Sequence, residues 1–247
     1  MIAQVAPDAR IIDLTHGIPA HDIQRGATVL AGAVRFMPER CVYLAVVDPG
    51  VGGERRGIAV QTAEGSILVG PDNGLLSLAW RELGGAVRAH EVTDRNVVIE
   101  PISRTFHGRD IFAPAAAHLS MGLPIEDLGA EIPVGELVEM SFPKTEIEAG
   151  TIRCAVLSID HFGNIQLTAT PEDLDAAGLG TAQRVAISIG HRSEEALRVS
   201  TFSGAAPGEL GLLEDSAGRL AVALSGGSAA KALRAAAGDS LTLAPVR

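Results

Sequence analysis

The sequence predicts an α/β N-terminal domain with a mostly parallel sheet, followed by a C-terminal all-β barrel domain. In the first half of the chain, short β-type runs alternate with helical patterns, which is typical of a sheet covered by helices. The second half consists mainly of short β-type runs separated by turns, as in small barrels. Between the halves, residues 128–150 contain prolines and glutamates without sustained periodicity, which indicates a linker.

The N-terminal elements follow from their local patterns. Residues 9–14 predict a short strand, and residues 22–36 predict a helix with Asp22 as N-cap and an end before Pro38. Residues 41–47 are almost entirely apolar, as in a strand covered on both faces, and this strand delivers Asp48 to its carboxyl end. The remaining expected elements are strands at 57–62 and 66–69 and helices at 75–83 and 111–121.

The C-terminal half contains the strands of the expected barrel. We predict them at 151–159, 164–168, 184–189, 197–200, 210–213, 220–224 and 240–243, with an alanine-rich helix at 229–237. The predicted domains are therefore an α/β domain over 1–133, a linker over 134–150 and a β-barrel domain over 151–247.

Composition excludes several classes of partner. The 247 residues include 30 acidic and 20 basic side chains, for a net charge of −10, and only 3% aromatic residues. Nucleic-acid binding needs basic patches or stacking aromatic side chains, so no nucleic acid is expected. The longest uncharged apolar runs are shorter than the roughly 20 residues that span a bilayer. The N-terminus lacks the pattern of a signal peptide, so we expect a cytoplasmic protein without a membrane partner.

Two polar segments lie where an α/β sheet usually places its ligands. Residues 48–56 (DPGVGGERR) follow the most apolar strand, although their glycines alone could serve only to allow a tight turn. Residues 103–110 (SRTFHGRD) precede a helix, and His107 by itself is equally compatible with a structural role. Together, Asp48, Arg55 and His107 form a set that can activate water. The arginine would stabilise a developing hydroxide, while the other two orient water and accept its proton.

A third polar segment, residues 158–164 (SIDHFGN), lies in the β-rich half. Asn164 offers the donor and acceptor that an adenine edge requires, and Phe162 could stack on a base. The alternative is a simple polar turn between two strands. No histidine, cysteine or carboxylate spacing typical of a metal site occurs, so no metal is expected.

Five segments taken in order resemble one family. They are residues 13–19 (DLTHGIP), 47–52 (VDPGVG), 70–74 (GPDNG), 105–110 (TFHGRD) and 160–164 (DHFGN). This combination resembles the S-adenosyl-L-methionine (SAM) hydroxide adenosyltransferases, the hydrolase branch related to the SAM-dependent fluorinases and chlorinases. The resemblance implies an N-terminal α/β domain, a C-terminal β-barrel, and a homotrimer with active sites between neighbouring subunits.

The resemblance also implies a reaction and its residues. Water or hydroxide would attack the 5′ carbon of SAM and yield adenosine and L-methionine, with SAM as substrate and no cofactor. The catalytic Asp, Arg and His of the family fall on Asp48, Arg55 and His107. Phe162 and Asn164 would hold adenine and Asp160 would face the methionine ammonium. Ser216 lies where the family contacts the methionine end.

One departure from the family pattern concerns the N-terminus. Family members begin with a strand that ends in a Thr-Asp-Phe-Gly motif, whose aspartate binds the ribose hydroxyls. The present sequence opens after that stretch, so we expect this strand and its ribose contact to be missing. Two alternatives to hydrolysis therefore remain open: a SAM-dependent halogenase, and a SAM- or adenosine-binding protein made inactive by the missing strand. The valine at position 51 and the lack of an extra loop favour the hydrolase over the halogenase.

Overall fold

The computed structural model describes residues 1–246 and separates the chain into two compact units, Met1–Met140 and the residues from Ser141 onward. The stretch 134–150, predicted as a linker, includes a short 3-10 helix, η3 (Val134–Glu136), in the first unit and a strand, β5 (Glu146–Glu148), in the second. Each unit has its own buried core. The elements that carry the polar segments are described below for each unit in turn.

The first unit contains a four-stranded sheet in the spatial order β1-β3-β2-β4. The strands are β1 (Val42–Leu44), β2 (Gly57–Thr62), β3 (Ile67–Pro71) and β4 (Ala86–Glu91). Strands β1 and β3 run parallel, but β2 is antiparallel to both β3 and β4. The predicted α/β class is thus confirmed, whereas the sheet is mixed and not mostly parallel. Only residues 63–66 join β2 to β3, and a parallel crossover needs a dozen or more residues.

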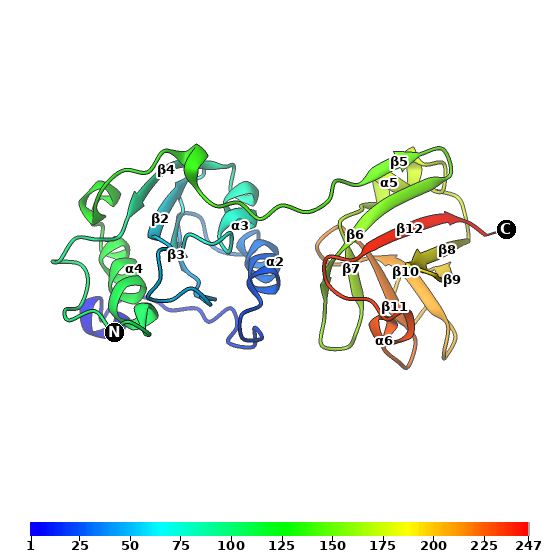
Figure 1. Cartoon of the computed structure of the whole chain (residues 1–247), viewed down its shortest axis with the longest axis horizontal. Helices are drawn as coiled ribbons and strands as arrows, with labels where there is room; N and C mark the ends of the chain where they lie inside the picture. Colours follow the sequence, from blue (N-terminus) through cyan, green and yellow to red (C-terminus); the bar gives the residue numbers. More distant parts are fainter. Residues whose placement is uncertain (247) are drawn as a thin grey trace. The chain divides into compact units, whose positions relative to one another are not determined.

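Helices cover both faces of this sheet, giving three layers (Figure 1). Helices α2 (Ile23–Val34) and α3 (Ser77–Glu82) lie on one face and α4 (Ala113–Ser120) on the other. Side chains of β2 alternate accordingly: Ile58 and Val60 belong to the α2–α3 core, and Ala59 belongs to the α4 core. The shorter helical elements of this unit are α1 (Ile2–Val5), the π-helical turn η1 (Gly108–Phe112) and the 3-10 helix η2 (Ile125–Leu128).

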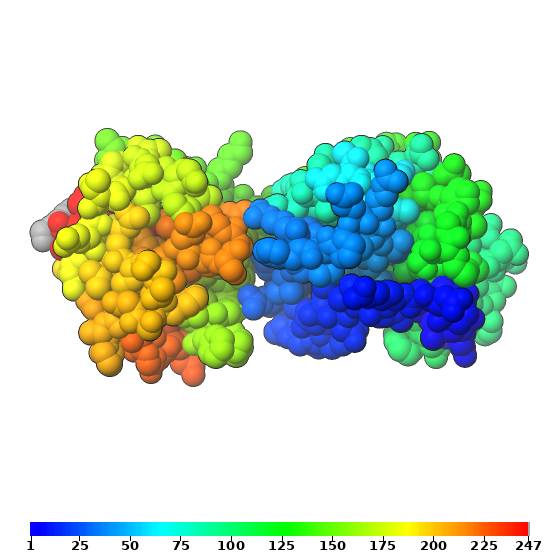
Figure 2. All heavy atoms as spheres, turned by 180° about the vertical axis from the view of Figure 1, so that it is seen from behind, coloured from blue at the N-terminus to red at the C-terminus, as the bar shows by residue number. Residues whose placement is uncertain are grey.

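Two predicted elements of this unit differ from the structure. The strand expected at 9–14 does not form: Ile11 and Ile12 are 57% and 44% exposed, and this dark-blue segment runs over the surface in Figure 2. The edge strand β1 pairs only with β3, so residues 9–14 do not extend the sheet on that side. The strand expected at 41–47 is regular only over β1, although the backbone N–H of Ala45 still donates to Val69. By contrast, α2 begins as predicted, because the Asp22 carboxylate accepts a hydrogen bond from the Arg25 N–H at 2.8 Å.

The second unit confirms the predicted barrel. Its ring runs β12-β8-β9-β10-β11-β7-β6 and closes because β12 pairs with both β8 and β6; β5 is attached to β6 outside the ring. Apolar side chains such as Ile165, Val185 and Leu241 fill its interior. The ring strands are β6 (Thr151–Ile159), β7 (Ile165–Leu167), β8 (Arg184–Ile189), β9 (Arg192–Arg198), β10 (Leu210–Glu214), β11 (Leu220–Leu224) and β12 (Ser240–Pro245). Two short helices accompany them, α5 (Pro171–Ala176) and α6 (Ala229–Leu233).

Within residues 1–246, every helix is too short or too polar to cross a membrane.

Candidate active site

Asp48 and Arg55 lie at the two ends of the glycine-containing loop that joins β1 to β2. The Arg55 Nε–H lies 3.0 Å from each oxygen of the Asp48 carboxylate, and Nη2 also donates to Asp48 Oδ2. The Arg55 side chain is 11% exposed and the Asp48 side chain is 5% exposed. An arginine–carboxylate pair of this kind fixes both groups in one orientation. The loop therefore presents one well-defined charged pair at the carboxyl end of β1.

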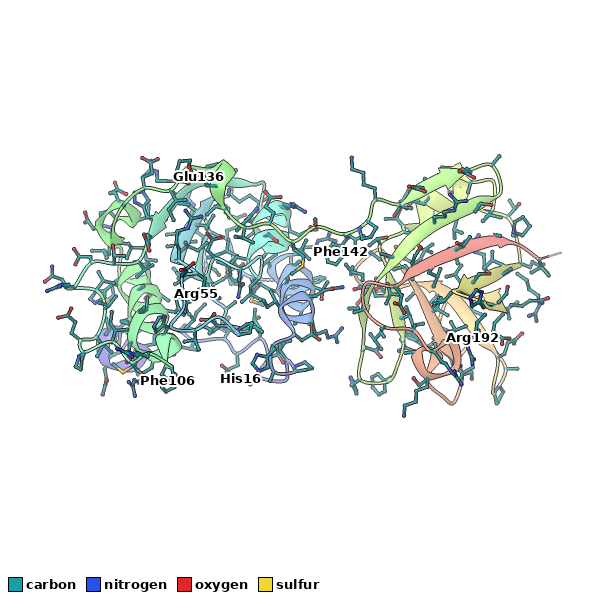
Figure 3. All side chains as sticks on the ribbon, in the orientation of Figure 1. His16, Arg55, Phe106, Glu136, Phe142 and Arg192 are labelled. Atoms are coloured by element: carbon teal, nitrogen blue, oxygen red, sulfur yellow. The ribbon has the colours of Figure 1, made fainter. Side chains whose placement is uncertain are left out.

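His107 joins this pair from the segment before η1. Its Nδ1 lies 2.7 Å from Nη2 of Arg55. A guanidinium only donates hydrogen bonds, so Nδ1 must accept, and the neutral imidazole carries its proton on Nε2. The Phe112 ring lies below the guanidinium, with its centroid 5.2 Å from Cζ of Arg55. Figure 3 places Arg55 among the inner side chains of the first unit, with Phe106 at the edge.

The surroundings of His107 favour its neutral form. Burial has the largest effect and lowers the pKa of His107 from its ordinary value of 6.5, and the adjacent Arg55 charge lowers it further. The carboxylates of Asp48 and Asp110 act in the opposite direction. With a lowered pKa, His107 is neutral at pH 7, which agrees with the hydrogen bond that its Nδ1 accepts.

Gly52 allows the loop of residues 48–55 to pack against the segment of His107. Gly52 has φ +75°, and a Cβ at this position would overlap the carbonyl oxygen of Arg104. Glycine is therefore needed both for the backbone conformation and for the close approach. The neighbouring Asp110 is completely buried and accepts hydrogen bonds from the Ser103 N–H at 2.8 Å and from Arg109 Nε at 2.6 Å. Arg109 and Asp110 thus pair with each other, and Asp110 fixes the turn that carries His107.

The second predicted set, in the C-terminal unit, is centred on the turn between β6 and β7. Asp160 Oδ1 accepts hydrogen bonds from the N–H groups of Phe162 and Asn164, both at 2.9 Å, and Oδ2 accepts from Asn164 Nδ2 at 2.8 Å. Phe162 is 67% exposed, and its ring contacts that of His161 in a tilted arrangement, with centroids 3.6 Å apart and an interplanar angle of 42°. The carboxylate thus shapes the turn, orients the Asn164 amide and leaves the Phe162 ring open to solvent.

Ser216 occupies a different turn, between β10 and β11, and is exposed. The antiparallel pairing of β7 with β11 places this turn and the Asp160 turn at opposite ends of β7, about 10 Å apart along the strand at roughly 3.3 Å per residue. A chain of side-chain hydrogen bonds runs between them: Ser158 donates to Gln166 at 3.1 Å, and Gln166 donates to Asp215 at 2.6 Å. Ser216 therefore does not touch Asp160 or Asn164, and only an extended ligand could reach both turns.

Comparison with known proteins shows the family of the chain. Residues 1–129 match the family model of the SAM hydroxide adenosyltransferase N-terminal domain, and residues 154–242 match that of the C-terminal domain. The chain belongs to the SAM hydroxide adenosyltransferase family. The match confirms the resemblance seen in the sequence motifs, and it covers both units.

Individual members and relatives of the SAM hydroxide adenosyltransferases agree with this assignment. An (R)-S-adenosyl-L-methionine hydrolase from Salinispora tropica is 46% identical over 98% of this chain and 88% of its own length. The Thermus thermophilus protein of the same name is 38% identical over 94% and 87%. A fluorinase from an Actinoplanes species is 28% identical over 73% and 68%. A crystal structure of an uncharacterized conserved protein from Thermotoga maritima superimposes with a TM-score of 0.90 at 32% identity, covering 98% of this chain and 92% of that one.

Sequence reasoning missed several residues that contact the cluster of Asp48, Arg55 and His107 or the chain beside it. Phe112 was predicted only as part of an apolar helix, yet its ring lies against Arg55. Asp72 and Asn73 belong to the 70–74 motif without a predicted role, but both contact the chain next to the charged pair. The sequence held one indication that Asp72 and Asn73 have a structural role, namely that these polar residues directly follow an apolar strand. Polar groups that become buried there need specific hydrogen-bond partners. Among residues 1–246, no three His, Cys, Asp or Glu side chains gather in a way that could hold a metal ion.

Proposed function

We propose that this protein hydrolyses S-adenosyl-L-methionine to adenosine and L-methionine by attack of water at the 5′ carbon. The observation that carries the proposal is the contact of Asp48, Arg55 and His107, three residues from two separate segments that form one charged, largely buried cluster. The hydrolase names of the relatives from Salinispora and Thermus support the same reaction. No cofactor is needed, because the substrate already carries its leaving group.

The chemistry demands help for the nucleophile only. A lone pair of water forms the new bond to C5′, while the electrons of the breaking C5′–S bond pass to sulfur. The positively charged sulfonium thereby becomes the neutral thioether of methionine, and the attacking water loses one proton. Because the leaving group needs no proton, the enzyme has to lower the cost of deprotonating water, whose pKa is about 15.7, and to align it with the C–S bond.

The geometry gives the three residues different roles. The Nδ1 atom of His107 is already engaged by Arg55, so its Nε2–H is the group that can hold the oxygen of the attacking water. The Asp48 carboxylate is then the acceptor for the proton that water releases. Arg55 keeps both neighbours in place and provides the positive charge that favours a hydroxide-like oxygen.

The second unit supplies the groups for the substrate's two ends. Asn164, oriented by Asp160, suits the adenine edge, and the exposed Phe162 ring suits its face. The Asp160 carboxylate also faces the methionine ammonium in this proposal, and Ser216 contacts the methionine end. We further propose a cytoplasmic homotrimer in which the first unit of one subunit and the second unit of its neighbour enclose the substrate.

A product assay tests this function. The purified protein is incubated with SAM at neutral pH, with and without chloride, and adenosine, methionine and 5′-chloro-5′-deoxyadenosine are quantified by chromatography. We expect equal amounts of adenosine and methionine, lost in His107→Ala. Chloride-dependent formation of the chlorinated nucleoside would identify a halogenase instead, and SAM binding without any product would identify a binding protein. Light scattering of the same sample checks the trimer.

A further inference from the structure

The turn after β3 connects to both ends of the loop that carries Asp48 and Arg55. Its residues Asp72 and Asn73 are consecutive, and the Asp72 side chain is 2% exposed. Asp72 contacts the residue after Arg55, and Asn73 contacts the residue before Asp48. One short turn thus holds the two ends of a loop whose middle contains three glycines.

Asn73 fixes the Asp48 end of this loop. Its Nδ2 donates to the carbonyl oxygen of Val47 at 2.9 Å, while its Oδ1 accepts from the Leu75 N–H at 3.1 Å. The Val47 carbonyl belongs to the peptide group that leads into Asp48. Holding this peptide plane fixes the N and Cα atoms of Asp48, from which its side chain starts, because the peptide group is planar.

Asp72 fixes the Arg55 end. Its Oδ2 accepts from Arg56 Nε and Nη2 at 2.9 and 2.6 Å, and its backbone N–H donates to the Arg56 carbonyl at 3.0 Å. Its other oxygen accepts from the Val138 N–H at 2.9 Å. Arg56 is therefore tied through both its carbonyl group and its side chain, which holds in place the residue that directly follows Arg55.

We propose that Asp72 and Asn73 are positioning residues, which set the geometry of the Asp48–Arg55 pair by clamping the two ends of its loop to one turn. Turn hydrogen bonds and the packing of Gly52 on Arg104 shape the middle of the loop, while the two clamped ends hold the residues that flank Asp48 and Arg55. The inference rests on the proposed function for its kinetic consequence, because a misplacement of about 1 Å in a catalytic group can cost on the order of 100-fold in rate.

The first residue of α3, which follows this turn, offers a matched control. Ser77 is fully buried, donates from Oγ to the Gly74 carbonyl at 2.7 Å and accepts from the Met140 N–H at 2.9 Å. These contacts stabilise the turn and the segment of Met140 but involve no residue of the loop 48–56. Ser77→Ala therefore removes one side-chain hydrogen bond to the turn, at Gly74, and one to Met140 without releasing either end of the loop.

The experiment compares wild type, Asn73→Ala and Ser77→Ala in three measurements. Thermal unfolding establishes that the variants are folded and comparably destabilised. Kinetics with SAM give kcat and KM separately. NMR follows hydrogen exchange of the Arg55 Nε–H, which faces both oxygens of Asp48, and the absence of its signal in Arg55→Lys assigns it.

For Asn73→Ala we expect kcat to fall about tenfold or more, with KM within about twofold of wild type. The Arg55 Nε–H should also lose its protection from exchange, while Ser77→Ala retains both the rate and the protection. If Asn73→Ala and Ser77→Ala behave alike in kcat and in exchange, the positioning role is wrong. Should Asn73→Ala fail to fold, Asn73→Asp replaces it, because it keeps the acceptor for Leu75 but turns the donor to Val47 into a carboxylate oxygen, which repels the Val47 carbonyl.

Asp72→Asn tests the other end of the clamp. It retains an oxygen that can accept from Val138 but gives up the ion pair with Arg56, so a smaller fall in kcat is expected, again at nearly constant KM. A wild-type rate for this variant would overturn the assignment of Asp72. If the wild-type protein itself does not hydrolyse SAM, the proposed function fails, whereas the exchange of the Arg55 Nε–H still decides whether the turn positions the pair.

Discussion

At the scale of single residues, the candidate site depends on Arg55, which contacts both other members of the cluster. One planar guanidinium faces both Asp48 oxygens through Nε and reaches His107 through Nη2. A lysine ammonium is a single point charge without this planar fork. It therefore cannot bind both oxygens of Asp48 and Nδ1 of His107 in the same geometry. The positive charge alone would not preserve the arrangement.

Arg55→Lys is accordingly expected to lower kcat for SAM by about 100-fold or more, the usual cost of removing one donor from a preorganised site. Steady-state kinetics measure the loss. Arg35→Lys is the control, because Arg35 makes an exposed ion pair with Glu82 on the surface of the same unit. Equal activity of the two variants would show that charge, and not the guanidinium geometry, is what the site needs.

The lowered pKa of His107 predicts a one-sided pH profile. Protonation at Nδ1 would remove the acceptor for Arg55, so kcat/KM should fall in acid with a midpoint below 6.5 and stay level from there to about pH 8. The free energy of unfolding should depend on pH in the same direction, because His107 binds its proton more readily in the unfolded chain than in the folded one. The stability contributed by this group is present above pH 6.5 and is lost as pH falls through the lowered pKa. A profile with its midpoint above 6.5 would contradict the neutral His107.

At the scale of elements, the site is made by loops that follow or precede regular structure. The loop of residues 48–56 follows β1, the His107 segment precedes η1, and they meet where Gly52 packs on the backbone of Arg104. The sequence predicts β1, β2 and the helix after His107, but the contact between the two loops depends on a glycine whose role is visible only in three dimensions. The π-helical start of that helix and the antiparallel β2–β3 hairpin were likewise missed.

Gly52→Ala tests this contact. The new Cβ would overlap the Arg104 carbonyl, so the His107 segment must move away, and we expect kcat to fall at least tenfold together with a destabilisation of about 1 kcal/mol or more. Gly85→Ala is the matched control, since Gly85 also has positive φ but no other atom lies within 4 Å of the position that its Cβ would take. Both variants carry the backbone strain, and only the first should lose activity; chemical denaturation and SAM turnover measure the two effects.

At the scale of the whole molecule, the second unit owes its integrity to a single closing strand. β12 is the strand that pairs with both β8 and β6, so it joins the two ends of an otherwise open sheet. Leu241, the second residue of β12, pairs with Cys154 of β6 and Ile189 of β8 and is completely buried. Closure removes the free strand edges that would otherwise be exposed, and the turns that carry Asp160 and Ser216 are held by this ring.

Leu241→Ala should therefore lower the free energy of unfolding by about 2–5 kcal/mol, the range for truncating a buried leucine. Ile147→Ala is the control, because Ile147 is 40% exposed on β5, outside the ring, and should cost less than about 1 kcal/mol. Urea titrations followed by circular dichroism give both values. A similar small loss for the two variants would mean that β12 is not needed to close the barrel.

The amino-acid order was enough to predict the family, the two structural classes along the chain and the residue types of the chemistry. Apolar periodicity and motif order are local properties, so Asp48, Arg55 and His107 could be named before any contact was known. The mixed strand directions, the unpaired state of residues 9–14 and the tautomer of His107 emerged only from the folded chain. The contacts of Asp72 and Asn73 with the two ends of the loop that carries Asp48 and Arg55 emerged in the same way. These features depend on which distant segments meet, and a hydrogen bond between residues far apart in the chain leaves no periodic pattern in the sequence.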